Sequence, residues 1–111
     1  AEEFHLTSFF ERLHRDAIVR MKKERQIQPW VDIDFTARSI MLDQVAVQNM
    51  WAGGNIDDDS YPSFARLSVL RIMTPLTKAS VRKDLVEEIR QLQNQLCFAS
   101  TGRDGEDEAQ Y

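Results

Sequence analysis

The chain has 111 residues, of which 42% are hydrophobic and 29% are charged, a balance typical of one globular domain and not of a disordered chain. Its one cysteine, Cys97, excludes an internal disulfide, and with only two distant histidines it offers no zinc ligand set. The sequence contains no membrane-length apolar run and no secretory signal pattern, so we expect an intracellular protein, cytoplasmic or nuclear, that does not enter a membrane.

The net charge of −4 is unevenly distributed along the chain. Residues 101–111 contain one arginine and four acidic residues, which sum to −3, together with two glycines. Such a composition is typical of a flexible terminus. We therefore expect a single helical domain over residues 1–100, followed by a flexible acidic tail over residues 101–111.

The first helix is predicted to begin near Ser8, because Ser8 and Glu11 have the spacing of a capping box. It should end before Pro29, which disfavours helical geometry at the preceding residue. Apolar residues then recur at helical spacing of three and four. They are Phe10, Leu13, Ala17 and Met21, and Phe9 and Ile18 widen this stripe.

Residues 30–35 alternate between apolar and acidic, which fits either a short strand or an extended connector. We favour the connector, with Asp32 or Asp34 capping a second helix from about Phe35 to Trp51. Residues 53–54 are both glycine, which suits a left-handed helix end.

A third helix is predicted after Asp59 or Ser60 as cap, with Pro62 tolerated in its first turn. It is apolar on most of its circumference, as a central helix would be, and residues 74–75 (Thr-Pro) should end or kink it.

The fourth helix should begin with Thr77 or Ser80 as cap and run to about Phe98. Its leucines and isoleucine step by four, three and four residues, which predicts a heptad-like apolar seam. The predicted fold is therefore all-α, a small domain resembling a four-helix bundle.

Two acidic patterns suggest a cation but do not complete a site. Asp32 and Asp34 lack a third ligand nearby. Asn55, Asp57 and Asp59 match the first three ligand spacings of an EF-hand loop, yet a serine and an arginine stand where that loop needs glycine and glutamate. No catalytic constellation is evident either, so we expect a protein that is not an enzyme and uses no metal or cofactor.

The apolar faces and the aromatic residues at helix ends favour a protein–protein interaction module: a small subunit, adaptor or regulator in a homo- or hetero-oligomer. The expected interface residues are Trp30, Trp51, Leu85, Ile89, Leu92, Leu96 and Phe98. The alternative is a nucleic-acid-associated regulator that uses the basic face of the first helix. Its expected phosphate contacts are Arg12, Arg15, Lys22 and Lys23.

Overall fold

A computed structural model describes the backbone of residues 2–99 and the side chains of residues 9–96. The described chain is all-α, as the sequence predicts, and resembles a small four-helix bundle. Residues 100–111 lie outside the described part, so the division of the chain at residue 100 stays a prediction. The elements are α1 (Glu2–Lys23), α2 (Ile33–Ala52), α3 (Tyr61–Met73), a 3-10 turn (Thr74–Leu76) and α4 (Ala79–Ala99).

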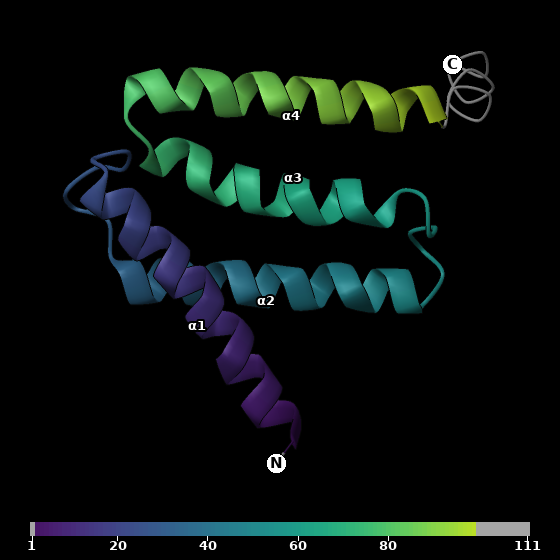
Figure 1. Ribbon diagram of the computed structural model, residues 1–111. Coiled ribbons are helices and arrows are strands. Elements are labelled where there is room, and N and C mark those ends of the chain that lie inside the picture. The colour runs from purple at the N-terminus through teal and green to yellow at the C-terminus, as the bar shows by residue number, and fades with distance from the viewer. Residues whose placement is uncertain (1, 100–111) are drawn as a thin grey trace.

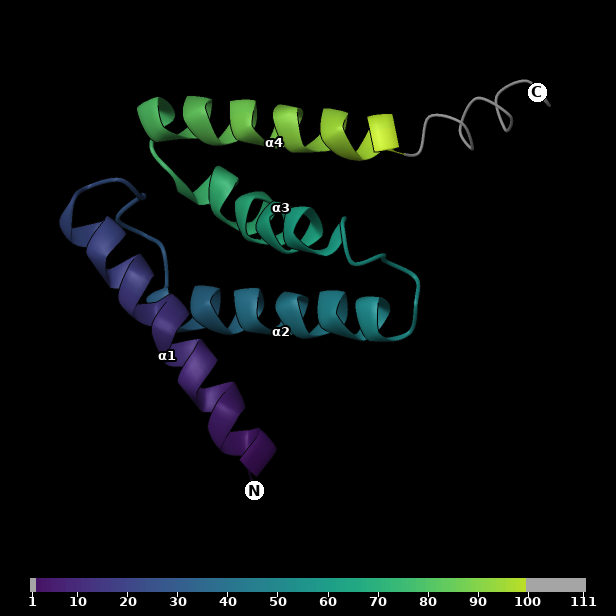
Figure 2. The same ribbon diagram turned by 45° about the vertical axis from the view of Figure 1, so that its right-hand side comes forward.

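Helices α2, α3 and α4 lie side by side with alternating direction, and α3 occupies the middle position (Figure 1 and Figure 2). The central place of α3 is the one predicted from its apolar circumference. Helix α1 crosses α2 at an angle and packs against it. The molecule measures 49 × 41 × 21 Å, so it is a flat layer with α1 added on α2.

The hydrophobic core lies at the end of the layer where the α1–α2 connector meets the α3–α4 connector. Helices α1, α2 and α3 and the α1–α2 connector each give one or two buried side chains to it, and burying a large apolar side chain is worth about 1.5–3 kcal/mol. The core residues are Ile18, Ile27, Val31, Ala37, Ile40 and Met73.

Only part of the predicted apolar stripe of α1 packs on α2. Ile18 is buried, whereas Phe10 and Leu13 remain about half exposed and Ala17 is exposed as well. The reason is that α2 meets α1 on the side of Ile18, where ion pairs from Glu11 and Arg15 flank the contact.

A short backbone pairing ties the two connectors together. Ile27 and Thr77 form an antiparallel bridge, in which the Gln28 N–H donates to the Leu76 carbonyl and the Lys78 N–H donates to the Gln26 carbonyl, both at 2.9 Å. The pairing fixes the end of α1 next to the beginning of α4, although about fifty residues separate them.

Thr77 lies at the centre of this pairing and is fully buried. Its hydroxyl donates to the Thr74 carbonyl at 2.7 Å, and its own carbonyl accepts from Arg82 Nη2 at 2.7 Å. The prediction that Thr77 or Ser80 caps α4 is therefore wrong, because the first helical bond runs from the Arg82 N–H to the Lys78 carbonyl. Tertiary contacts turn the Thr77 hydroxyl inward instead.

The connectors and the helix stops agree with most sequence signals. Asp32 caps α2, as predicted, by accepting a bond from the Phe35 N–H at 2.9 Å. The predicted extended connector over residues 30–35 is only partly right, because residues 29–30 form a turn and α2 already begins at Ile33. Gly54 has a φ of 82°, which confirms the left-handed stop after α2.

One predicted helix start and one predicted cap are wrong. Helix α1 begins at Glu2, so Ser8 lies inside it. Ser60 precedes α3 but its side chain makes no capping bond; instead the Asp57 carboxylate accepts from the Ser60 N–H at 2.7 Å. The acidic residues before α3 still lie at the positive end of its dipole.

Arg25 ends α1 in a left-handed conformation, with a φ of 58°. The Gln26 N–H donates to the Met21 carbonyl and the Arg25 N–H donates to the Lys22 carbonyl, which is the Schellman arrangement that favours glycine. A left-handed residue with a side chain costs about 1–2 kcal/mol, so Arg25→Gly should raise the free energy of unfolding by about 1 kcal/mol in a urea titration.

Two further variants control for the charge and for the backbone. Arg25→Ala removes the same charge but keeps the backbone cost, so it should not stabilise. Gly54→Ala should lower the free energy of unfolding by about 1 kcal/mol, because Gly54 has positive φ while the space around its Cβ is open. A loss of stability in Arg25→Gly would contradict this account of the turn.

Candidate protein-docking surface

A hollow of about 860 Å³ opens among α2, α3 and α4. Its walls are mainly apolar, and we call it the apolar trough. Asp43, Val47 and Met50 line it from α2 and follow one another at helical spacing, whereas Asp34 and Arg38, which pair with α1, lie on another side of that helix. The trough therefore opens away from the α1 contact. Its large apolar side chains are Val47, Met50, Ile56, Phe64, Leu67 and Leu96.

Polar contacts hold the α2 and α3 walls of the trough together. The buried Ser68 hydroxyl donates to the Asp43 carboxylate, and the Gln44 amide donates to the Ala65 carbonyl at 2.8 Å. A buried hydroxyl without a partner would cost about 1–3 kcal/mol, so this pairing also fixes which side of α3 faces α2.

The α2–α3 turn closes one end of the trough. Trp51 Nε1 donates to Asp58 Oδ1 at 2.8 Å, and the Trp51 ring stacks on Tyr61 with centroids 4.6 Å apart. Ile56 is buried beneath the turn. Trp51 thus holds the turn in place while 41% of its surface stays exposed.

A second hollow, of about 440 Å³, lies beside the beginning of α2. Trp30 and Phe35 line it, and they are 69% and 73% exposed. Phe35, Ser39, Asp43 and Ala46 follow one another at helical spacing, so this hollow and the trough share one side of α2. The polar residues Ser39 and Asp43 lie between the two hollows on that side, so the hollows are separate apolar surfaces.

An ion pair joins α3 to α4 outside the residues that line the trough. Arg66 donates to both carboxylate oxygens of Glu88, at 2.6 and 3.0 Å. These hydrogen bonds raise the pKa of Arg66 and lower the pKa of Glu88. Because both side chains are largely in contact with solvent, the pair should stabilise the fold by only a few tenths of a kcal/mol.

The Glu88 pair gives the fold a small pH dependence. A carboxyl with a lowered pKa stabilises the folded state above its ordinary pKa, near 4.5, and loses that contribution as the pH falls further. Glu88→Gln should therefore be slightly less stable than the natural chain at pH 7, and the difference should be smaller at pH 3. Urea titrations at both pH values test this, and a difference that grows at low pH would contradict it.

The interface residues predicted from the sequence do not lie together on one surface of the structure. Leu85, Ile89 and Leu92 are partly buried on the α4 side that faces α3, and only the fourth seam residue, Leu96, also lines the trough. Trp30 and Trp51 lie at opposite ends of α2 and so belong to different surfaces. The side chain of Phe98 lies outside the described residues. Their role in an interface stays a prediction.

The sequence analysis did not predict that Phe64, Val47 and Met50 form one surface. Phe64 is 38% exposed and Met50 is 49% exposed, and both face the trough. The apolar circumference of α3 was the available signal, since a helix with neighbours on two sides leaves a third apolar side uncovered.

The predicted phosphate contacts differ in whether their side chains already bond to other groups of the protein. Arg15 is engaged by Asp34 at 2.7 Å, and Lys22 Nζ lies 3.4 Å from the Val31 carbonyl. Arg12 and Lys23 are exposed. The connector pairing also brings Lys78 beside the end of α1, which the sequence does not reveal.

The acidic pairs singled out in the sequence have structural roles. Asp32 caps α2 and Asp34 pairs with Arg15. Over the side chains that the structure describes, no three histidine, cysteine, aspartate or glutamate groups converge on one point. Partial burial lowers the pKa of His14, so its imidazole is neutral at neutral pH.

Comparison with protein-family models, with curated proteins and with solved structures returns no match for this chain. Among the described residues, no helix combines the length and the apolarity that crossing a membrane requires.

Proposed function

We propose that this chain is a non-enzymatic protein–protein interaction module, a small subunit, adaptor or regulator that docks a partner in the apolar trough. The supporting observation is the trough itself, with Met50 and Phe64 exposed at its mouth. Covering such side chains is favourable by roughly 25 cal/mol for each Å² of apolar surface removed from water. Exposed apolar surface in a hollow is a recurrent property of interaction sites.

An amphipathic helix is the partner whose shape fits best. The trough runs between neighbouring helices, and a helix laid in such a groove presents apolar residues at spacings of three, four and seven. The single cysteine favours an intracellular setting for this complex, cytoplasmic or nuclear.

Site-specific photo-crosslinking in cells tests the proposal. A photoreactive amino acid at Phe64 should give a discrete protein adduct, identified by mass spectrometry. The same group at Val86 is the matched control, because Val86 is 37% exposed but lies on the side of α4 away from α3. Equal labelling from both positions, or no adduct from Phe64, would refute docking in the trough.

With the partner identified, Phe64→Glu and Val86→Glu separate the trough from general surface effects. Phe64→Glu places a charge in the contact and should weaken binding roughly tenfold or more, as loss of a buried aromatic anchor does. Val86→Glu should leave the affinity unchanged. Isothermal titration gives both values.

A nucleic-acid-associated regulator remains the second candidate. The observation that favours it is the connector pairing, which adds Lys78 to the cations Lys22 and Lys23 at the end of α1. Phosphate contacts release counterions, so any such binding should fall steeply between about 50 and 200 mM salt. Binding in the apolar trough should change little over the same range.

A further inference from the structure

The end of the molecule where the connectors pair carries a concentration of positive charge, which we call the basic end. It consists of residues 20–28 and 78–84, which contain seven lysines and arginines and two acidic residues, Glu24 and Asp84. Its net charge is therefore +5, whereas the net charge of the whole chain is −4. The Ile27–Thr77 bridge and the two backbone bonds beside it hold the segments together. Most of these cations are exposed.

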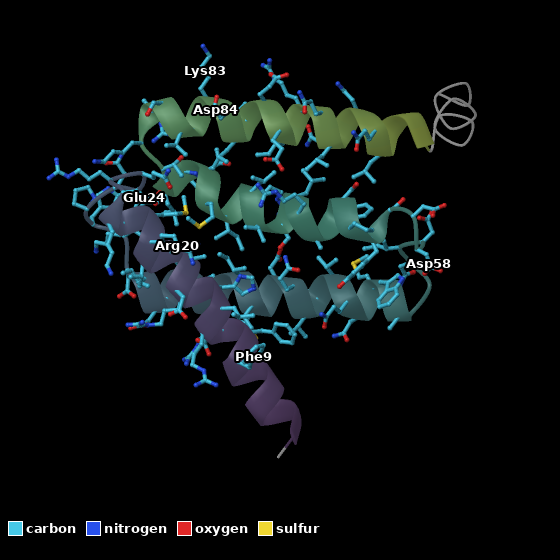
Figure 3. The ribbon with its side chains drawn as sticks, viewed as in Figure 1. Phe9, Arg20, Glu24, Asp58, Lys83 and Asp84 are labelled. Carbon is cyan, nitrogen blue, oxygen red and sulfur yellow. The ribbon has the colours of Figure 1, made fainter. Side chains whose placement is uncertain are left out.

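The opposite end of the layer is acidic. Residues 39–65 contain four aspartates and no lysine or arginine, and three of the four stand together in the α2–α3 turn. We call Asp57, Asp58 and Asp59 the acidic turn. Figure 3 shows Asp58 at one end of the layer and Arg20, Glu24 and Lys83 toward the other. The 20 residues of α2 separate the two ends by about 30 Å, which is several Debye lengths at physiological salt.

Each end also presents an exposed aromatic ring. Trp30, 69% exposed, belongs to the connector of the basic end, and Trp51 and Tyr61 stack beside the acidic turn. An indole face next to an arginine or lysine gains cation–π attraction in addition to the apolar contact. The two ends therefore offer complementary charge together with aromatic anchors.

From this arrangement we infer that the basic end of one copy docks on the acidic turn of a second copy. The contact uses two different surfaces, so it is heterologous, and every assembly that does not close into a ring keeps one unoccupied basic end and one unoccupied acidic turn. It involves neither the apolar trough nor the trough's partner. A polyanion would be attracted to the basic end alone and would leave the acidic turn without a role.

Two variants with one end blocked test the inference on the full chain. Lys23→Glu with Arg25→Glu reverses charge at the basic end, where both side chains are exposed. Asp58→Asn with Asp59→Lys changes the acidic turn, and the asparagine keeps an acceptor for Trp51 Nε1. Arg12→Glu with Arg90→Glu is the matched control, since it makes the same change in net charge as the first variant at exposed positions outside both ends.

Sedimentation velocity at low salt should show the natural chain and the control growing in mass with concentration beyond a dimer. Each blocked variant alone should remain a monomer of 12.9 kDa. An equimolar mixture of the two blocked variants should stop at about twice that mass, because only one complementary contact is left. Salt at about 0.5 M should dissociate all of these assemblies.

Three results would overturn the inference: a natural chain that stays monomeric at every concentration, blocked variants that still assemble alone, or a mixture that does not pair. Bound nucleic acid could also give a high mass, and nuclease treatment before sedimentation distinguishes it from self-association. If the mass falls to 12.9 kDa on that treatment, the basic end binds nucleic acid and the inference is wrong.

Discussion

Replacing Ile40 with alanine is expected to lower the free energy of unfolding by about 2–5 kcal/mol. Ile40 is only 2% exposed and belongs to the core cluster in which α1, α2, α3 and the α1–α2 connector meet. Removal of its side chain takes apolar contacts from several elements and leaves a cavity that a closely packed interior fills only in part. For a domain of this size, such a loss removes a large fraction of the total stability.

The matched control is Leu42→Ala, two residues along the same helix. Leu42 is 61% exposed, so the same kind of truncation should change stability by no more than about 0.5 kcal/mol. Urea unfolding followed by circular dichroism, compared at constant m-value, gives both numbers. Comparable losses in the two variants would show that Ile40 is not at the centre of the core.

The second large effect is expected at Thr77. Thr77→Val keeps the size of the side chain but removes the hydroxyl that donates to the Thr74 carbonyl in a fully buried position. The Thr74 carbonyl then keeps only the longer bond from the Thr77 N–H, at 3.4 Å, and the change should cost about 1–3 kcal/mol. Because Thr77 is the residue paired with Ile27, the destabilisation should extend across the connector pairing.

Amide hydrogen exchange shows whether the effect reaches the pairing. The N–H groups of Gln28 and Lys78 bond across it and should exchange faster in Thr77→Val, whereas those in the middle of α2 should not. Thr77→Ser keeps the hydroxyl and should keep the protection of Gln28 and Lys78. If valine and serine raise exchange equally, the hydroxyl does not hold the connectors.

Local signals in the sequence located the helix ends well where one conformation is strongly preferred. Proline at 29 and 75 and the glycine pair at 53–54 each mark a break between helices that the structure confirms. These residues limit backbone angles or permit left-handed ones whatever surrounds them, so their effect is visible without a fold.

Capping signals were less decisive, because a cap is worth only about 1 kcal/mol. Asp32 caps α2 as predicted, but α1 continues through Ser8, and Thr77 turns into the core and does not cap α4. In each failure the competing gain was of similar size. A longer helix or a buried hydrogen bond was enough to outweigh the local preference.

The sequence predicted that the protein has an apolar docking surface, but not which residues form it. The sequence shows more apolar residues than four solvated helices need, and it places aromatic residues at their ends. It does not say that Phe64 and Leu96 share a hollow with Met50, or that Trp30 and Trp51 face different ends. Those statements depend on which side of α3 meets α2. Contacts such as the hydrogen bond from Ser68 to Asp43 decide that side.

The sequence by itself determined that this protein is a set of four helices with a basic segment near residue 23 and an acidic one near residue 58. Helix period, prolines and glycines are local properties, and so is the order of charges along the chain. Only the tertiary structure decided that the two connectors pair, because the pairing of Ile27 with Thr77 joins residues fifty positions apart and leaves no local pattern. That pairing builds the basic end, and the packing of α3 between α2 and α4 builds the apolar trough.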